Sequence, residues 1–375
     1  MASTRWLLVL MLWLLPWLQM VKSGFAYQHF QSSPTWNSPV VIPKDGVYLL
    51  SVIVDPCDNC RSSLQLYCKC QGKELFFFTA YGRRISSHAE VATGLKKNDK
   101  VILKNAGQIK SSSSLSVVYV AELNSFYITA MNGLLWTKQS PVVYTAQLTP
   151  KGWIDLKNPN TKTTFRIPTT GMYWVTARPK TYLEPLIVTV RIKSKVLFTV
   201  YGEERKTVST SGAFRLAAGS TIWAVTKGDV TYEPHSILSL VYLAGNKKPN
   251  TYPFQHLAFT AAYEKIRRVK AQEVLLFPRV LTDHGYIHID GYTEIPRTGS
   301  YMVSIRPDPE SASIVIVTFY LNGKMYWVIY AEEGVPVGAT ISIFLKVGSY
   351  LEVRSEKATT LGDGTMFSIA FIQPF

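Results

Sequence analysis

The chain has 375 residues, 47% of them hydrophobic, and a formal net charge of +15. Its Tyr, Phe, Val, Ile and Thr content, interrupted by Gly, Pro and Ser, favours strands, and no sustained helical periodicity is present. The nearest helical candidate, Glu264–Glu273, is short and lies where a loop is expected. These features exclude an all-helical class, and the length suits two to four domains. We therefore predict an all-β chain of several domains.

Residues 1–23 have the features of an export signal. Arg5 supplies a positive charge, Trp6–Met20 is almost wholly apolar, and small residues follow at Ser23 and Gly24. The apolar run of about 16 residues is shorter than the roughly 20 that span a bilayer. A cleaved signal is therefore favoured over an uncleaved anchor, and we expect a secreted, extracellular protein with no membrane span after cleavage.

The phrase Ile-Pro-x-x-Gly-x-Tyr occurs three times, starting at Ile42, Ile167 and Ile295. Three further landmarks follow each copy in the same order. They are an aromatic stretch that ends in tyrosine, then Leu-x-x-Asn or Leu-x-x-Gly, then Ser-apolar-x-aromatic-apolar. Four landmarks in three copies predict a triplicated domain. The three units span residues 24–123, 124–245 and 246–375.

Local patterns predict how each unit folds. Each proline of the phrase is expected at the first residues of a strand, and each glycine at a turn that needs positive φ. The run Val47–Val54 suits a central strand buried on both faces. In the third unit, Asn322-Gly323 separates two apolar runs, which is a strong hairpin signal. Short strands with regular turn signals predict a sandwich of two sheets.

The third unit carries a longer pattern. It comprises Leu257-Ala-Phe-Thr-Ala, Tyr292-x-x-Ile-Pro-x-x-Gly-x-Tyr, Tyr320-x-Asn-Gly and Leu345-x-x-Gly-x-x-Leu-x-Val. This pattern resembles the globular head domain of complement C1q, which belongs to the tumour necrosis factor-like superfamily of ten-stranded jelly rolls. The resemblance covers the third unit along its whole length and nearly all of the second. No collagen stalk precedes any unit.

The first unit departs from that pattern. Between Gly24 and Ile42 it has too few residues for the usual opening strand and its loop, so we expect a shortened sandwich. The resemblance also implies threefold trimers, which leads to the hypothesis that the three units form a pseudo-trimer within one chain. The alternative is a string of units that each trimerise with other chains. The join at Glu122–Ser125 reaches only about 13 Å and is tight for a ring, whereas Gly245–Pro253 reaches about 30 Å.

All four cysteines lie in the first unit, at Cys57, Cys60, Cys68 and Cys70. Cys57-x-x-Cys60 has the spacing of zinc ligands. Cys68-x-Cys70 does not, and an exported protein meets an oxidising compartment. Two structural disulfides are therefore favoured over zinc, with all three pairings open.

The middle unit, residues 124–245, has fourteen basic and six acidic residues. Arg191, Lys193 and Lys195 alternate across an expected hairpin turn, and Arg205 and Lys206 follow the next strand. Such a basic cluster could bind a sulfate or phosphate group. The alternative is that these lysines only protect a strand edge from pairing.

Acidic loop residues of the third unit are the calcium candidates, because heads of the resembled family often hold calcium near the trimer axis. The other units do not repeat these acids, and no cofactor is required. The cluster DHGYIHID, with His284 and His288, is more typical of a solvated turn than of a metal site. The calcium candidates are Asp308, Glu310, Glu332 and Glu333.

No histidine lies in a catalytic motif, so we expect no enzyme. We predict a secreted recognition or adaptor protein that binds an extracellular protein or glycan through exposed loops, and not nucleic acid. One alternative is a structural protein of an extracellular matrix, such as a biomineral or capsule matrix. A second is a receptor ligand of the tumour necrosis factor type, whose partner would bind the grooves between units.

Overall fold

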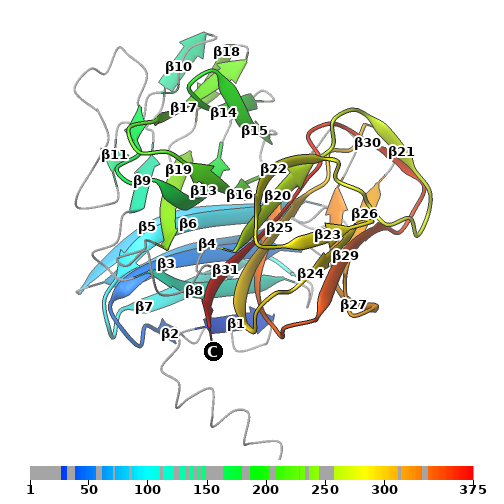
Figure 1. The fold of residues 1–375 in the computed structure, drawn as a ribbon. Helices are drawn as coiled ribbons and strands as arrows, with labels where there is room; N and C mark the ends of the chain where they lie inside the picture. Colours follow the sequence, from blue (N-terminus) through cyan, green and yellow to red (C-terminus); the bar gives the residue numbers. More distant parts are fainter. Residues whose placement is uncertain are drawn as a thin grey trace, which may run out of the picture.

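The computed structural model is built of antiparallel β-sheets, and no helix occurs among the residues that it describes (Figure 1). These residues are 27–31, 39–55, 61–70, 72–83, 87–109, 113–121, 127–131, 135–138, 142, 146–147, 164–179, 186–202, 208–227, 229–232, 236–244, 257–310, 314–331 and 337–374. The predicted all-β class is confirmed. The predicted unit boundaries and both joins fall outside the described residues, so the boundaries stay predictions.

The third sandwich, β20 to β31, has two five-stranded sheets in jelly-roll order. Its inner sheet runs β22 (Arg279–His284), β20 (Ala258–Ala262), β31 (Met366–Pro374), β25 (Gly299–Arg306) and β28 (Ala339–Leu345). Its outer sheet runs β23 (Ile287–Ile289), β24 (Tyr292–Glu294), β29 (Tyr350–Ser355), β26 (Val315–Leu321) and β27 (Lys324–Ala331). A ribbon of β21 (Arg267–Val269) and β30 (Thr359–Leu361) closes one end. The segment Glu264–Glu273 is not helical, as expected.

The second sandwich, β9 to β19, repeats this order. Its inner sheet runs β11 (Ala146–Gln147), β9 (Tyr127–Met131), β19 (Ile237–Ala244), β13 (Gly171–Arg178) and β16 (Thr210–Leu216). Its outer sheet runs β12 (Phe165–Arg166), β17 (Thr221–Lys227), β14 (Leu186–Ile192) and β15 (Lys195–Gly202). A two-stranded ribbon joins β10 (Leu135–Lys138) to β18 (Asp229–Tyr232).

The first sandwich, β1 to β8, is smaller in its described part. Its inner sheet runs β1 (Tyr27–Gln31), β8 (Ser114–Ala121), β3 (Gly46–Val54) and β6 (Ser87–Leu95). Its outer sheet runs β2 (Val40–Val41), β7 (Lys100–Ala106), β4 (Arg61–Cys70) and β5 (Lys73–Arg83). An opening strand is present, contrary to our expectation, because β1 pairs with β8 as β9 pairs with β19 and β20 with β31. The sequence argument failed because it allowed for a long loop between the first two strands.

The repeated phrase has a different structural role from the one predicted. Each proline lies just before a two-residue bend, and each glycine is the first residue of the strand that follows, without positive φ. A Cβ at Gly46 would lie 2.2 Å from the Tyr119 ring, and one at Gly171 would lie 2.3 Å from the Tyr242 ring. Glycine is therefore required by the close approach of a ring from the neighbouring strand.

The tyrosine of the phrase makes the same contact in all three sandwiches. Its hydroxyl donates a hydrogen bond to the backbone oxygen four residues earlier, which fixes the bend that follows the proline. These donors are Tyr48 to Lys44, Tyr173 to Thr169, and Tyr301 to Arg297.

Positive φ occurs instead at the Leu-x-x-Asn or Leu-x-x-Gly landmark. Asn98 has φ 71°, and Gly219 and Gly348 both have φ 76°. The amide of each residue donates to the backbone oxygen of the isoleucine that opens the phrase, over 2.8 to 2.9 Å. This landmark therefore joins the two sheets at corresponding points of the three sandwiches.

The predicted local elements are confirmed where the structure describes them. Every residue of β3 is buried, as expected for a central strand. Asn322 and Gly323, both with positive φ, form the turn between β26 and β27. Arg191 to Lys195 spans the turn between β14 and β15.

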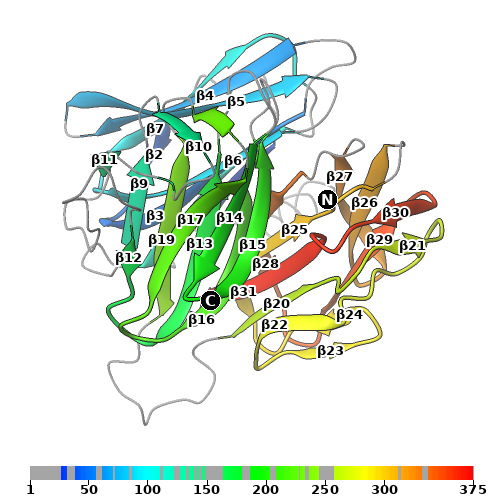
Figure 2. The ribbon, with the colours of Figure 1, turned by 90° about the horizontal axis from the view of Figure 1, so that it is seen from above.

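Each sandwich has its own apolar core, and a fourth apolar cluster lies between them. The three sandwiches surround this cluster with their inner sheets (Figures 1 and 2). The outer sheets face away from it.

Candidate functional site

The apolar junction draws on all three inner sheets. Trp174 and Met302 are completely buried in it, and Leu49 is 1% exposed. These three residues occupy the same position of β13, β25 and β3, three residues after the glycine of the phrase. The other members are Val47, Ala92, Val118, Val120, Met172, Ala213, Val241, Leu243, Ala258, Ala370 and Ile372.

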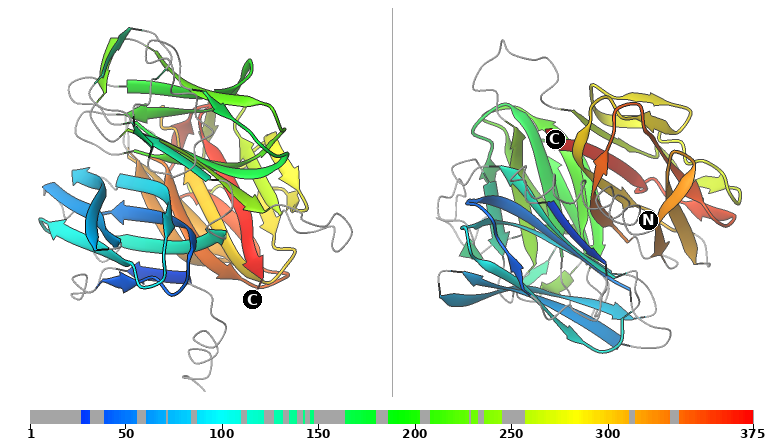
Figure 3. Two further views of the ribbon diagram at one scale, coloured as in Figure 1. Left: turned by 90° about the vertical axis from the view of Figure 1, so that its left-hand side faces the viewer. Right: turned by 90° about the horizontal axis from the view of Figure 1, so that it is seen from below.

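Strand contacts between the sandwiches form a closed cycle. Strand β6 of the first sandwich contacts β13 and β19 of the second. Strand β16 of the second contacts β25 and β31 of the third, and β28 of the third contacts β3 and β8 of the first. Because β6, β16 and β28 are equivalent strands, the same contact is used three times in the ring. Figure 3 shows the three sandwiches packed against one another in two further views.

A polar layer crosses this junction. Glu90, Ser211 and Thr340 stand at the same position of the three equivalent strands, as their pairing registers show. Oε1 of Glu90 accepts hydrogen bonds from Nε1 of Trp174 at 2.9 Å, from the hydroxyl of Ser211 at 2.9 Å and from Thr176. One carboxyl group of the first sandwich is thus held by donors of the second.

Burial dominates the electrostatics of Glu90. The residue is 0% exposed, and this desolvation raises the pKa of its carboxyl against the hydrogen bonds from Thr176, Trp174 and Ser211. The junction therefore favours the neutral form of this side chain.

His88 lies in the same layer, two residues before Glu90 on β6, so the two side chains lie on the same face of the strand. Its Nε2 is 2.8 Å from the hydroxyl of Ser51, and its Nδ1 is 2.6 Å from the hydroxyl of Ser209 in the second sandwich. Burial lowers the pKa of His88 to about 3, so the imidazole is neutral at ordinary pH. Sequence analysis did not single out His88 or Glu90. Aligning the three copies of the strand would have shown two ionisable residues where the other copies have Ser, Gly or Thr.

A small cleft opens between the first and third sandwiches beside His88. It has room for little more than one water molecule. Ile53, Asp55 and Ser87 line one side, and strand β27 together with the start of β28 lines the other. The cleft is therefore a groove between two sandwiches.

The predicted anion site is only partly described. Lys193 and Lys195 are exposed at the β14–β15 turn, and Arg191 is half-buried on β14. Arg205 and Lys206 lie outside the described residues. Anion binding at this hairpin stays a prediction.

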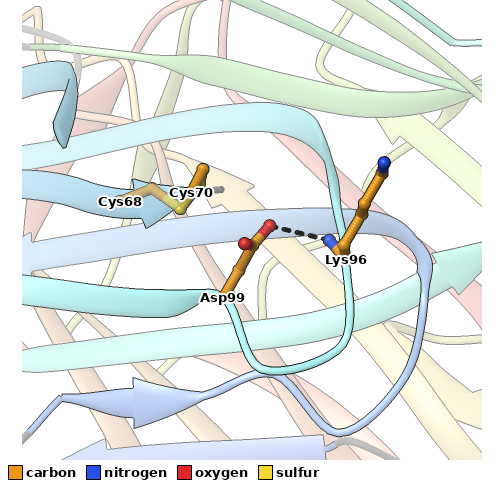
Figure 4. The surroundings of a disulfide bond; sticks show 4 residues. All are labelled: Cys68, Cys70, Lys96 and Asp99. Carbon is orange, nitrogen blue, oxygen red and sulfur yellow. Dashed lines mark hydrogen bonds between the residues drawn. A yellow bond between two sulfur atoms is a disulfide. The ribbon is translucent and has the colours of Figure 1, made fainter. Parts of the chain in front are cut away.

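One disulfide joins Cys68 to Cys70 at the end of β4, near Asp99 (Figure 4). The sulfurs and a carboxylate oxygen of Asp99 lie within 4.8 Å of one another. Asp99 accepts a hydrogen bond from the amide of Lys96 at 2.8 Å. Because the two sulfurs are bonded to each other, they cannot act as thiolate ligands for zinc. Cys57 and Cys60 lie outside the described residues.

Replacing both Cys68 and Cys70 by alanine should lower the free energy of unfolding by only about 1.5 kcal/mol through lost cross-linking, since the closed loop is very short. Urea denaturation of the variant and the parent measures this difference. A loss above about 4 kcal/mol would show that the pair constrains far more than its own strand end.

The calcium candidates do not form a described cluster. Asp308 is 6% exposed, and burial raises the pKa of its carboxyl, while neighbouring Arg306 lowers it. Its Oδ2 accepts a hydrogen bond from the amide of Gly364 at 3.0 Å. Glu310 is exposed, and Glu332 and Glu333 lie outside the described residues. Within the described ranges, no group of three acidic or histidine ligands converges at this place.

The outer sheet of the third sandwich has a surface that sequence analysis missed. Tyr292 and Tyr350 are 40% and 36% exposed, and their rings pack edge to face with centroids 5.8 Å apart. Glu352, which is 1% exposed, pairs with Tyr292 and lies two residues after Tyr350 on β29. The alternation of β29 could have revealed this surface, because Leu351 and Val353 point to the core and the residues between them point out.

Comparison with known proteins does not assign a family. No family model and no curated sequence matches the chain. Among the described residues, no helix is long and apolar enough for a membrane span. Solved structures with local similarity include Eiger TNF from S. frugiperda, with 13% identity over 33% of this chain and 96% of that one, at a TM-score of 0.29. Others are the tandem CBM22 domains of Paenibacillus barcinonensis Xyn10C (10% identity, 56% and 82% covered, TM-score 0.21) and PNGF-II (9% identity, 84% and 100% covered, TM-score 0.27).

Proposed function

We propose that this chain is a secreted, non-enzymatic recognition or adaptor protein whose three C1q-like units form a pseudo-trimer within one chain. The observation that carries the proposal is the closed cycle of equivalent strand contacts around one shared apolar junction. Such an assembly turns three outer surfaces toward solvent, where they can bind protein or glycan ligands. The export signal remains the basis for extracellular localisation.

The side chains at the junction favour one copy of each unit. Glu90 is bonded to donors of the second sandwich, and Trp174 fills space that Leu49 and Met302 leave. Three first units together would bring three buried carboxyl groups into contact, which is costly. Three second units would bring three indole rings to the same place and overfill it. The units therefore fit one another better than they fit copies of themselves.

The purified mature protein should have a mass near 40 kDa by light scattering at micromolar concentration, because the ring is closed within one chain. A stable mass near 120 kDa would contradict the pseudo-trimer and favour trimerisation between chains. Measurement over a hundredfold range of concentration separates weak association from a fixed assembly.

Recognition is favoured over catalysis because His88 and Glu90 are buried and both are hydrogen-bonded to protein groups. A matrix protein remains the alternative, and it should self-associate and be recovered from insoluble material. A receptor ligand of the tumour necrosis factor type is a second alternative, whose partner would bind the grooves between units. Saturable binding of a soluble ligand by the monomer supports recognition.

A further inference from the structure

The outer sheet of the third sandwich presents a mixed aromatic and charged surface, which we name the tyrosine–glutamate face. It consists of Tyr292, Tyr320, Tyr350, Glu352 and Arg354. Tyr292 and Tyr320 flank Glu352 in the pairing register of β24, β29 and β26. Tyr350 and Arg354 lie two residues to either side of Glu352 on β29, and side chains two residues apart in a strand share a face.

At the polar centre of this face, Glu352 and Arg354 form an ion pair in which one hydrogen-bonding atom of each side chain has no partner. Nη2 of Arg354 donates to Oε1 of Glu352 at 2.8 Å. Oε2 of Glu352 and Nε of Arg354 are buried and have no hydrogen-bond partner. One buried acceptor and one buried donor therefore lack partners, which costs free energy that hydrogen bonds to a bound ligand could offset.

Aromatic rings surround that centre. Tyr292 and Tyr350 are about two-fifths exposed, and Arg354 lies 4.7 Å from the centre of the half-buried Tyr320 ring. The Tyr320 hydroxyl donates to Glu356 at 3.0 Å, which fixes the ring. Exposed side chains such as Tyr350 change rotamer rapidly, so the buried centre can be uncovered.

The other two sandwiches lack this surface. At the positions of Tyr320 and Glu352, the second sandwich pairs Arg191 with Trp223, and the first pairs Tyr67 with Ile102. The arrangement is therefore particular to the third sandwich and is not a requirement of the fold.

We propose that the tyrosine–glutamate face binds a neutral sugar residue of a glycan. This proposal rests on the recognition function proposed above and names its ligand class and site. A sugar hydroxyl is both donor and acceptor, so it can donate to Oε2 of Glu352 and accept from Nε of Arg354. The apolar face of the sugar ring packs on Tyr350 or Tyr292, because aromatic side chains commonly line ligand-binding sites and provide such a surface.

Charge selects against anionic glycans at this face. Glu352 and Glu356 outnumber Arg354 there, and Glu294 is exposed on the neighbouring strand. A sulfated chain would be repelled here and attracted to the basic hairpin of the second sandwich. Neutral and sulfated glycans should therefore bind different sandwiches.

Affinity electrophoresis of the full mature chain in gels with neutral polysaccharides (β-glucan, mannan, xylan and a soluble chitin derivative) tests the proposal, with heparin as the anionic probe. We expect the parent to be retarded by at least one neutral polysaccharide. Tyr350→Ala and Arg354→Lys should each weaken that retardation at least tenfold, since one removes the ring and the other removes Nε and keeps the charge.

Tyr330→Ala is the matched control, because Tyr330 is a similarly exposed tyrosine on β27, at the far end of the same sheet. It should bind as the parent does, and all variants should keep the parent's unfolding midpoint. Retardation by no neutral polysaccharide, or equal retardation of parent and Tyr350→Ala, overturns the proposal. Retardation by heparin alone that is lost in Lys193→Ala/Lys195→Ala also overturns it, yet leaves the recognition function standing. Binding to no soluble ligand, with recovery only as insoluble self-associated protein, would overturn the recognition function itself.

Discussion

Replacing Trp174 by alanine should lower the free energy of unfolding by about 3 to 5 kcal/mol, the range for large-to-small changes of a buried aromatic side chain. Trp174 is completely buried at the junction of the three sandwiches and donates to Glu90 at 2.9 Å. The variant leaves a cavity and removes one of the donors to a buried carboxyl group. Urea denaturation followed by circular dichroism measures the loss.

Two further variants separate the causes. Trp174→Phe keeps most of the packing and removes the indole donor, so it should cost about 1 to 2 kcal/mol. Trp223→Ala removes a half-buried tryptophan from the outer sheet of the same sandwich and should cost less than Trp174→Ala. Equal losses for Trp174→Ala and Trp223→Ala would contradict the central place of the junction in stability.

The loss of stability in Trp174→Ala should also affect the other two sandwiches. Trp174 belongs to a cluster with Leu49 and Met302 of the other two sandwiches, so its removal should weaken all three contacts. Hydrogen exchange of the inner strands β3, β13 and β25 should therefore accelerate together. Faster exchange confined to β13 would mean that the sandwiches are held together by other contacts.

Local sequence patterns predicted much of the fold because they depend on neighbouring residues. Asn322-Gly323 forms its turn by backbone conformation alone, and the apolar run Val47–Val54 follows from burial of both faces of one strand. The role of Gly46 could not be predicted in this way. It depends on the Tyr119 ring, which belongs to a strand far along the chain.

The polar layer shows the same limit. Within its own strand, Glu90 is one polar residue among small and apolar ones. Its role depends on hydrogen bonds from Trp174 and Ser211, which reach it only when two sandwiches pack together. The basic hairpin was located correctly, but its ligand depends on partners that no pattern in this chain specifies.

Acidification should destabilise the protein between about pH 6.5 and pH 3, and His88 should be a main cause. The unfolded chain binds a proton at this histidine below its ordinary pKa of about 6.5, whereas burial lowers the pKa to about 3 in the folded state. The contribution of His88 is therefore complete above pH 6.5 and is lost as the pH falls through the folded value. At pH 4.5 the loss should be about 2 to 3 kcal/mol.

The groups around His88 determine how this effect is measured. Arg178 disfavours the imidazolium, and Oε2 of Glu90 lies 3.9 Å from Nε2. The raised pKa of Glu90 acts in the opposite direction, because a neutral buried carboxyl stabilises the folded state below its unfolded pKa and loses that contribution as the pH rises. The total slope therefore mixes two groups of opposite sign.

The variant His88→Gln isolates the histidine, since glutamine keeps one donor and one acceptor for Ser51 and Ser209 and does not titrate. Subtracting its free energies of unfolding at pH 7.5 and pH 4.5 from those of the parent cancels the part due to Glu90. The parent should lose about 2 to 3 kcal/mol more than the variant over this interval.

His288→Gln is the matched control. His288 is only half-buried, although burial also lowers its pKa, so its replacement should change the acid slope less. Parallel slopes for the parent and His88→Gln would mean that His88 is protonated in the folded state, and that the junction admits a charge that its burial should exclude.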